Sequence, residues 1–195
     1  MLVCAASFAG IQFLLQKPHT PPVQVTPVKQ SEKRAPVVAA PAITDTQPDA
    51  QFLSIPKIGV KNAPVVQLGL TNDGAMDAPK NNTDVGWYDG SGRPGSGKGS
   101  ALIDGHAGVP GIPGVFVGLG RLAVDDLLTI NEKGTVFTYT VKKIETLSAE
   151  QVDMRKMMRS IEPDKEGLNL ITCSGDFTPS TQRYSDRVLV YAVRV

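Results

Sequence analysis

Two residues of the chain have the types and positions of a nucleophile and its acid–base partner. Cys173 ends the apolar run LNLITC and is followed by Ser-Gly, where a strand is expected to break into a loop. His106 follows the run SALIDG and is the only histidine after residue 50. A thiolate is a strong nucleophile and an imidazole titrates in the working pH range, so the pair predicts acyl transfer through a cysteine. A buried structural cysteine and a solvated loop histidine are the alternative.

Acyl transfer also needs a group that meets the negative charge on the carbonyl oxygen. Arg187 opens the last apolar run, RVLVYAVRV, and side-chain alternation along a strand predicts that it shares a face with Leu189 and Tyr191. Arg183 lies four residues earlier with the same parity, so the sequence leaves both arginines open for this role. A surface arginine is the alternative for either.

Composition limits the other kinds of chemistry. The chain has 195 residues, which suggests one domain or one domain with an appendage, and its formal net charge is +1. This balance argues against a nucleic-acid-binding protein. With 2 Cys and 2 His, and with Cys4 far from Cys173, we expect neither a zinc site nor a disulfide framework.

The elements that must position these residues are mostly strands. Short runs rich in Val, Ile, Leu, Tyr and Thr alternate with Gly, Pro, Asn and Asp, and together they predict a closed β-barrel. The predicted strands are Phe52–Ile55, Ala63–Leu70, Ser100–Gly105, Leu127–Asn131, Thr135–Leu147, Leu168–Cys173 and Arg187–Val195. The loop Asn131–Gly134 predicts a hairpin. One helix is expected from a capping box at Ser148 and Gln151, followed by an apolar stripe in which the methionines fill the core.

Two segments before residue 51 differ in character from the strand-rich part. Residues 1–16 carry no charge and are rich in Leu, Ala and Phe, which predicts part of a membrane anchor or signal-anchor. Residues 17–50 are rich in proline and contain neither an aromatic residue nor a glycine, which predicts a disordered, extended stalk. We therefore expect a folded domain at 51–195 that is held outside a membrane by a stalk.

The order of these residues resembles the sortases, the cysteine transpeptidases on the outer surface of Gram-positive-type bacteria. The resemblance covers most of 51–195, and the block from Val85 to His106 is most similar to the class E and class F branches of actinobacteria. It rests on IPKIGV, VGWYDGSGRPGSGKGSALIDGH, GVFVGLGRL, LITCSG and DRVLVYA. Asp104 departs from the pattern, because Ala is common at that position before Gly-His.

The resemblance implies an all-β-dominated fold, a closed eight-stranded sortase barrel with one or two short helices. It implies catalytic roles for Cys173, His106 and Arg187, and it matches Thr172 to the substrate-binding Thr before the nucleophile. Cys173 would attack an LPXTG-like sorting signal of a secreted protein and form a thioester. An amine of lipid II, a peptidoglycan stem peptide or a pilin Lys would resolve it, with water as a slow substitute. The enzyme would use no cofactor and no metal, and its single N-terminal anchor would place it on the extracellular side of the cell membrane.

Three other interpretations remain on sequence grounds. An L,D-transpeptidase would carry His-Gly before its cysteine, whereas Leu-Ile-Thr stands here. A papain-like hydrolase would place its cysteine before its histidine in the chain, and the order here is reversed. The non-enzymatic alternative is an exported β-domain that binds wall polymers or proteins and buries its cysteine.

Overall fold

The computed structural model of the chain describes residues 51–195. The anchor predicted at 1–16 and the stalk predicted at 17–50 lie outside the described residues. Within 51–195, none of the helices has both the length and the apolar character that crossing a bilayer requires.

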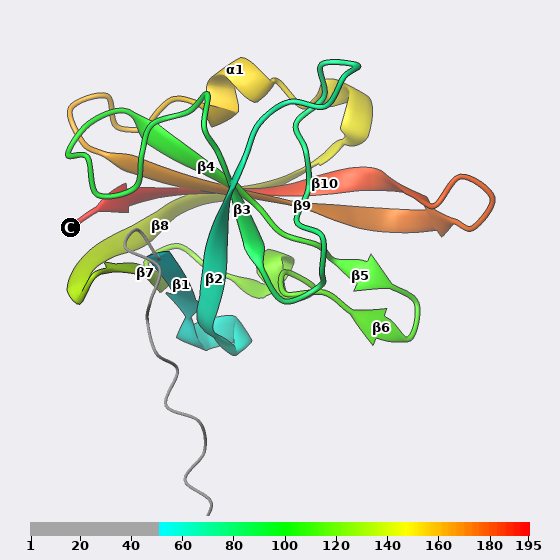
Figure 1. Cartoon of the computed structure of the whole chain (residues 1–195), viewed down its shortest axis with the longest axis horizontal. Helices are drawn as coiled ribbons and strands as arrows, with labels where there is room; N and C mark the ends of the chain where they lie inside the picture. Colours follow the sequence, from blue (N-terminus) through cyan, green and yellow to red (C-terminus); the bar gives the residue numbers. More distant parts are fainter. Residues whose placement is uncertain (1–50) are drawn as a thin grey trace, which may run out of the picture. The chain divides into compact units, whose positions relative to one another are not determined.

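The described residues form short strands joined by turns and a few single-turn helices (Figure 1). The strands are β1 (Gln51–Ile55), β2 (Val60–Leu68), β3 (Val85–Tyr88), β4 (Ser100–Asp104), β5 (Gly108–Val109), β6 (Ile112–Pro113), β7 (Leu127–Glu132), β8 (Thr135–Ser148), β9 (Gly167–Thr178) and β10 (Arg183–Arg194). The helices are η1 (Pro56–Ile58), η2 (Leu119–Arg121), η3 (Ala149–Gln151) and α1 (Met154–Met157).

Eight of these strands close into a barrel in the order β1-β2-β3-β4-β9-β10-β8-β7. Most neighbours are antiparallel, but β2 pairs with β3 and β4 pairs with β9 in parallel. A parallel pair requires a long crossover connection, and the segment from β4 to β9 supplies one that includes β5 to β8. The eight-stranded barrel expected from the sequence is confirmed.

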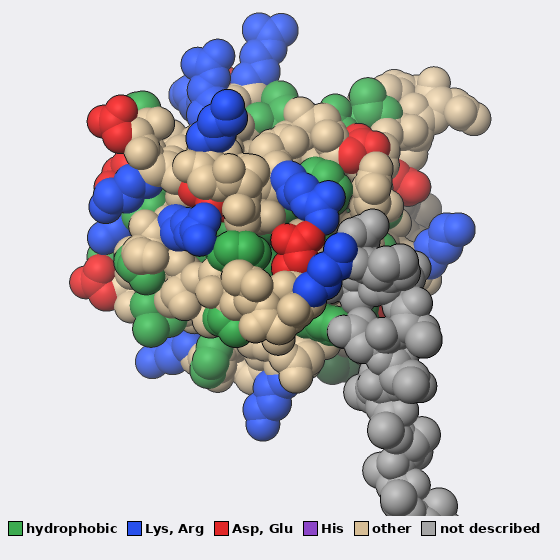
Figure 2. All heavy atoms as spheres, turned by 60° about the vertical axis from the view of Figure 1, so that its left-hand side comes forward, with side chains coloured by type: hydrophobic (Ala, Val, Ile, Leu, Met, Phe, Trp, Pro, Cys, Tyr) green, Lys and Arg blue, Asp and Glu red, His purple; other side chains and the backbone are tan. Residues whose placement is uncertain are grey.

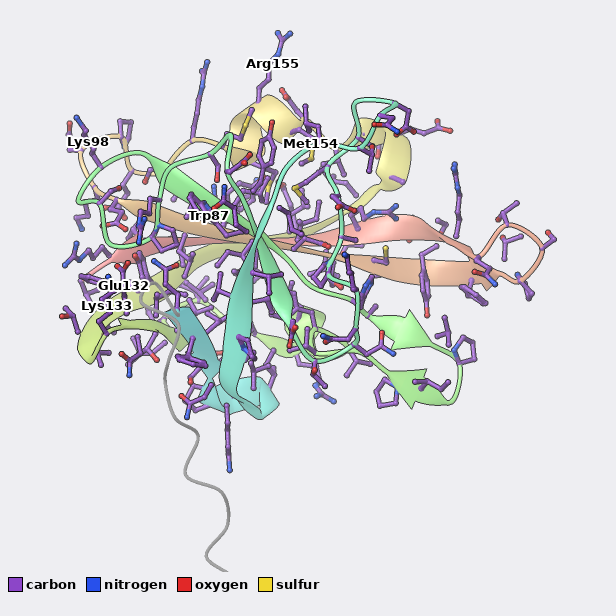
Figure 3. The ribbon with its side chains drawn as sticks, viewed as in Figure 1. Trp87, Lys98, Glu132, Lys133, Met154 and Arg155 are labelled. Carbon is purple, nitrogen blue, oxygen red and sulfur yellow. The ribbon has the colours of Figure 1, made fainter. Side chains whose placement is uncertain are left out.

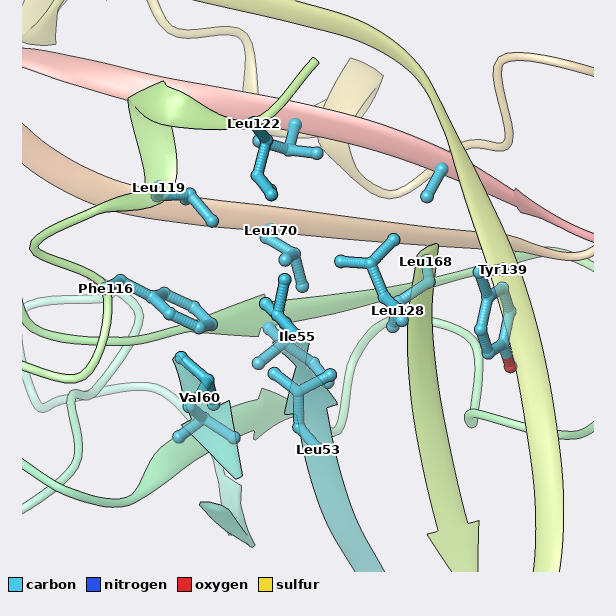
Figure 4. Close-up of a cluster of buried hydrophobic side chains, with 14 of the residues drawn as sticks. Leu53, Ile55, Val60, Phe116, Leu119, Leu122, Leu128, Tyr139, Leu168 and Leu170 are labelled. Carbon is cyan, nitrogen blue, oxygen red and sulfur yellow. The ribbon is translucent and has the colours of Figure 1, made fainter. Parts of the chain in front are cut away.

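Side-chain alternation divides the barrel wall into an inner and an outer face. Val188, Val190 and Ala192 of β10 point into the interior, which is filled with aliphatic and aromatic side chains (Figure 4). Leu189 and Tyr191, on the opposite face of the same strand, join a second cluster outside the barrel. The face that Arg187 is predicted to share with Leu189 and Tyr191 is therefore the outer face of the barrel.

The outer cluster is covered by the segment that contains α1. Met157 is fully buried there, and Met154 packs against the cluster, so the methionines fill the core as predicted. The Asn169 side chain on β9 donates hydrogen bonds to the carbonyl of Met157 (2.8 Å) and to that of Arg159 (2.9 Å), which fastens this segment to the sheet. On the solvent side, Arg155 projects away from the domain (Figure 3).

The predicted helix is shorter than the sequence pattern indicated, and its start was predicted wrongly. Ser148 makes no side-chain capping hydrogen bond and belongs to the end of β8. The cap is Asp153, whose carboxylate accepts a hydrogen bond from the backbone N–H of Arg155 (3.0 Å) at the start of α1. An aspartate at this position satisfies an N–H group that the first turn leaves unpaired, and here the helix ends after that single turn.

The hairpin predicted at Asn131–Gly134 is confirmed. β7 and β8 pair up to Glu132 and Thr135, so the loop has two residues, Lys133 and Gly134, both with positive φ (52° and 84°). The Asn131 side chain accepts a hydrogen bond from the N–H of Gly134 (3.0 Å). Two positive φ values are the signature of the tight turn that matches the twist of an antiparallel pair.

A buried carboxylate holds the glycine-rich loop between β3 and β4. Glu166 accepts hydrogen bonds from the backbone N–H groups of Gly95 (2.5 Å) and Gly97 (2.9 Å) and from the Tyr139 hydroxyl (2.6 Å). It also forms an ion pair with Arg194 (2.9 Å). These bonds give the loop, which has no regular structure of its own, a fixed place beside the barrel.

Replacing Glu166 with Ala is expected to lower the free energy of unfolding by about 3–5 kcal/mol, because the Tyr139 hydroxyl, the Gly97 N–H and the Arg194 guanidinium lose their buried acceptor. Glu162→Ala is the matched control, since the ion pair of Glu162 with Lys165 is partly exposed and is worth at most about 1 kcal/mol. Urea unfolding of both variants measures the difference. Equal losses would show that the loop does not depend on Glu166.

Charges are mixed over the surface of the domain. On the face shown in Figure 2, Lys and Arg side chains are spread among polar, hydrophobic and acidic ones and do not merge into one basic patch. This agrees with the equal numbers of acidic and basic residues from residue 51 onward.

Candidate active site

Three adjacent strands, β4, β9 and β10, bring the candidate residues of the sequence analysis together. Arg187 on β10 pairs directly with Cys173 on β9. Asp104, the last residue of β4, pairs with Ile171 on β9 in parallel. Gly105, the residue before His106, donates a hydrogen bond to the carbonyl of Ile171 (3.3 Å), so His106 follows directly on the end of β4 beside β9. We call Cys173, Arg187 and His106 the row of candidate residues: the first two are paired across β9 and β10, and the third follows the strand that pairs with β9.

Strand alternation places the nucleophile and the arginine on the outer face of the wall. Cys173 has the parity of Ile171, and Arg187 has the parity of Leu189, both members of the outer cluster. Directly opposed residues on neighbouring strands have Cβ atoms about 4.5–5.5 Å apart. The guanidinium of Arg187 is therefore within side-chain reach of the atoms that react at Cys173.

The prediction that Cys173 ends its strand is wrong. β9 continues to Thr178, and its pairing with β10 shifts register beyond Cys173, where Asp186 pairs with Ser174 but Tyr184 pairs with Phe177. Gly175 occupies this irregularity with a φ of 81°, a conformation that glycine adopts without strain. The Ser-Gly signal thus marks a bulge beside the nucleophile rather than a loop.

The surroundings of Cys173 favour its neutral thiol. The side chain is half-buried, and this burial is the main cause that raises the pKa of the thiol above its ordinary value. The positive charge of Arg187 acts in the opposite direction and lowers the pKa, whereas the negative charge of Asp104 raises it further. Only the thiolate is a strong nucleophile, so the reaction requires a group that takes up the proton.

His106 is oriented by the segment before β3. Its Nε2 atom lies 2.8 Å from the carbonyl oxygen of Pro79, and its backbone carbonyl accepts a hydrogen bond from the N–H of Phe116 (2.9 Å). The described residues show no hydrogen bond between the imidazole and Cys173. Catalytic hydrogen bonds of this kind commonly tighten only when the substrate is bound. The residue before it, Gly105, is hydrogen-bonded to Ile171 and Thr172 of β9, the strand that carries Cys173.

The two candidate arginines, Arg187 and Arg183, differ in burial and in the groups that they contact. Arg187 is half-buried and donates hydrogen bonds to the backbone carbonyls of Asp186 (2.7 Å) and Tyr184 (3.1 Å), which hold its guanidinium on the strand opposite Cys173. Arg183 is exposed at the start of β10. The pKa of Asp73 is lowered mainly by a hydrogen bond from Thr71 and further by the charge of Arg183. Arg183 therefore acts on the loop that contains Asp73. β10 also begins four residues earlier than the sequence predicted, at Arg183.

Thr172 lies on the inner face of the wall and is almost fully buried. Its hydroxyl donates a hydrogen bond to the carbonyl of Gly105 (2.6 Å), which joins the end of β4 to β9 between His106 and Cys173. The substrate-binding role predicted for Thr172 stays a prediction. What the contact supports is a positioning role, in which Thr172 keeps the two strands that carry the histidine and the cysteine in register.

We expect Thr172→Val, which keeps the side-chain shape, to lower the free energy of unfolding by about 1–3 kcal/mol, because the buried Gly105 carbonyl loses its partner. Activity should fall as well, because Gly105, which loses this hydrogen bond, directly precedes His106 in the chain. Thr178→Val makes the same chemical change at an exposed position of β9 and should leave both properties unchanged. Thermal unfolding and peptide turnover of the two variants provide the test, and unaltered behaviour of Thr172→Val would refute the positioning role.

An open groove of about 550 Å³ lies next to the row of candidate residues. Its walls come from the β5–β6 hairpin and the far part of the β9–β10 hairpin, which lie close together (Figure 1). The Tyr184 hydroxyl donates a hydrogen bond to the carbonyl of Gly108 (3.0 Å) and ties the hairpins to each other. The lining residues are Ala107, Val109, Pro110, Gly111, Pro113, Val117, Gly175, Asp176, Phe177 and Tyr184. The groove is open to solvent and mostly apolar.

Sequence reasoning did not identify Asp104 as part of this site. Burial raises the pKa of its carboxyl to about 6, and the charges of His106 and Arg187 act against that rise. The signals in the sequence were an acidic residue at the end of an apolar strand, two positions before His106, and its departure from the residue common there in sortases. Within 51–195, no three His, Cys, Asp or Glu side chains are grouped in a way that could hold a metal ion.

Comparisons with known proteins identify the family to which this fold belongs. The protein-family model described as the sortase domain matches residues 53–195. A lid mutant of sortase A from Corynebacterium diphtheriae is 27% identical, with a TM-score of 0.57 over 75% of this chain and 69% of that chain. Sortase C1 from Streptococcus agalactiae is 27% identical, with a TM-score of 0.59 over 78% of this chain and 70% of that chain. A search of curated proteins finds no match.

The similar structures also include further sortases of class C and class D. Sortase C-1 from Actinomyces oris is 24% identical, with a TM-score of 0.59 over 77% of this chain and 74% of that chain. A sortase D5 transpeptidase from Clostridium perfringens is 23% identical, with a TM-score of 0.55 over 75% of this chain and 79% of that chain. Because these similar structures are of classes A, C and D, the class E or F assignment made from the sequence stays a prediction.

Proposed function

This chain belongs to the sortase family of cysteine transpeptidases, and from that membership we propose that Cys173, His106 and Arg187 carry its reaction. The observation that supports the assignment is the direct cross-strand pairing of Cys173 with Arg187, together with the position of His106 two residues after the Asp104–Ile171 pair. A half-exposed thiol in this arrangement also disagrees with the alternative of a binding domain that buries its cysteine.

The first half of the reaction acylates the enzyme. Neutral His106 takes the proton of the Cys173 thiol, and the resulting thiolate attacks the carbonyl carbon of the scissile peptide bond and forms a C–S bond. The carbonyl oxygen becomes an oxyanion, which the guanidinium of Arg187 stabilises by hydrogen bonding. The intermediate then collapses to a thioester as the C–N bond breaks, and protonated His106 gives its proton to the leaving amine.

The second half regenerates the enzyme. The nitrogen of an acceptor amine attacks the thioester carbon, and neutral His106 takes its proton. The C–S bond breaks, Cys173 leaves as a thiolate, and a new amide is released. Water that attacks in place of the amine gives a carboxylic acid, so we propose slow hydrolysis as a side reaction.

Sortases act on proteins with sorting signals and transfer them to amines. For this chain, we propose an LPXTG-like signal near the C-terminus of a secreted protein as the donor. We propose an amine of lipid II, a peptidoglycan stem peptide or a pilin Lys as the acceptor. The apolar groove beside Cys173 supports a peptide substrate, because it offers apolar walls next to the reacting atoms.

The test is a transfer assay with the full chain, a peptide that contains an LPXTG-like sequence, and a primary amine. The proposed function predicts that the N-terminal part of the peptide becomes joined to the amine, and that a smaller amount of the free acid appears. Absence of both products over a panel of sorting sequences and amines would refute it.

We further propose that residues 1–16 anchor the enzyme in the cell membrane and that 17–50 form a stalk that holds the catalytic domain on the extracellular side. The uncharged composition of the first segment and the proline content of the second support this organisation. The full chain should sediment with phospholipid vesicles, and a chain that begins at residue 51 should stay in solution. Equal sedimentation of the two would contradict the anchor.

A further inference from the structure

Asp104 lies next to the reacting residues without a place in the reaction described above. It is the last residue of β4, between Gly86 on β3 and Ile171 on β9. It has the parity of Leu102, which belongs to the outer cluster, so its carboxylate lies on the face that carries Cys173 and Arg187. It precedes His106 by two residues, as Ile171 precedes Cys173.

The charges around Asp104 come from three directions. β9 contributes Cys173, β10 contributes Arg187, and the segment after β4 contributes His106. On the remaining side, β3 faces Asp104 with Gly86, which has no side chain. The Asp104 carboxylate therefore interacts electrostatically with Cys173, His106 and Arg187, and β3 adds no charged side chain.

We propose that Asp104 is a fourth functional residue, a positioning carboxylate whose charge acts on Cys173, His106 and Arg187. In its ionised form it attracts Arg187 and the protonated ring of His106 and disfavours the thiolate of Cys173. The resting enzyme then keeps its nucleophile as a thiol and its imidazole close to a counter-charge. This proposal deepens the proposed function and rests on it for its catalytic meaning.

The proposal predicts a dependence on pH with a defined sign. Because burial raises the pKa of Asp104 to about 6, the carboxylate is neutral in mild acid and becomes charged as the pH rises through that value. Its influence on Cys173 is therefore absent below this pH and complete above it. A change in packing alone would act at every pH.

The folded state should be less stable when Asp104 is ionised. Its pKa is raised above the value of about 3.9 expected in the unfolded chain, so the native state binds the proton more tightly and loses stability as the pH rises through about 6. Asp104→Asn should therefore raise the melting temperature above neutral pH and leave it unchanged in acid.

The experiment measures the reactivity of Cys173 with a dipyridyl disulfide as a function of pH. All proteins are full chains that also carry Cys4→Ala, so that Cys173 is the only thiol. Asp104→Asn is compared with the parent and with Asp164→Asn, which removes the same charge at an exposed position outside the site. The pH dependence of kcat is recorded in parallel for the parent and for Asp104→Asn.

We expect Asp104→Asn to react about 3–10 times faster than the parent above neutral pH, since one unit of thiol pKa changes the thiolate fraction tenfold. The ratio should fall to one in mild acid, Asp164→Asn should behave as the parent, and the kcat profile should lose an inflection near pH 6. A ratio of one throughout, a slower variant, or a ratio that does not change with pH would each overturn the proposal.

The thiol measurement needs no peptide substrate, so it separates this proposal from the proposed function. If the parent transfers peptides and Asp104→Asn matches it in both assays, the role of Asp104 alone is refuted. If the thiol result is as expected but the parent shows no transfer with any sorting peptide, the proposed function falls and the electrostatic coupling of Asp104 to Cys173 remains.

Discussion

Replacing Cys173 with Ala is expected to abolish peptide cleavage and amine transfer and to leave the barrel folded. The Sγ atom forms the only covalent bond between enzyme and substrate in the proposed reaction, and no other described thiol can replace it. The side chain is half-buried on the outer face of β9, so its loss should change the free energy of unfolding by no more than about 1 kcal/mol.

The measurement is turnover of one sorting peptide by wild type, Cys173→Ala and Cys4→Ala, together with circular dichroism of each. Cys4→Ala is the matched control because it removes the other cysteine of the chain and should keep full activity. Measurable turnover by a folded Cys173→Ala protein would show that the thioester is not on the reaction path.

Replacing Arg187 with Ala is expected to lower kcat by about 10²–10³ with little change in KM, the loss typical of removing one oxyanion donor. Arg187 pairs with Cys173 across the sheet, and two backbone carbonyls hold its guanidinium there. Arg187→Lys should recover only part of the rate, because an ammonium lacks the planar fork of donors.

Arg183→Ala is the control for this prediction. Arg183 has the same parity on β10 but is exposed, and its charge acts on Asp73 rather than on Cys173. We expect its kcat to stay within a factor of about three of the wild type, because the exposed Arg183 makes no contribution to the activation free energy at Cys173. If Arg183→Ala were the more damaged variant on the same peptide, the oxyanion role would move to Arg183.

The parts of the fold that the sequence predicted are those set by local patterns. Apolar runs of strand length bounded by glycine and polar residues identified β1, β2, β4 and β7 to β10, and the Lys133-Gly134 turn required positive φ at both positions. β3 has four residues, one of them Gly86, and takes its order from parallel pairing with β2, so no local pattern reveals it. The strands β5 and β6 have two residues each.

In the candidate site, too, some features follow from local sequence patterns and others depend on contacts between distant segments. Residue chemistry was enough to propose Cys173 and His106, but strand parity left both Arg187 and Arg183 open, and the resemblance to sortases favoured Arg187. The contacts that fix them come from residues distant in the chain, such as the Pro79 carbonyl beside His106. The nearness of Asp104 to Cys173 depends on the parallel pairing of β4 with β9, which is a property of the closed barrel and not of either segment. The bulge at Gly175 likewise became visible only once β10 was in place.

The central claim is that Cys173 becomes acylated, and mass spectrometry of the full chain after digestion tests it most directly. The enzyme is mixed with a sorting peptide without an acceptor amine, quenched in acid and digested. The account predicts a mass increase equal to the N-terminal part of the peptide, located on the fragment that contains Cys173 and lost when a primary amine is added before the quench. Peptide turnover with no adduct on that fragment, or an adduct that persists in Cys173→Ala, would contradict it.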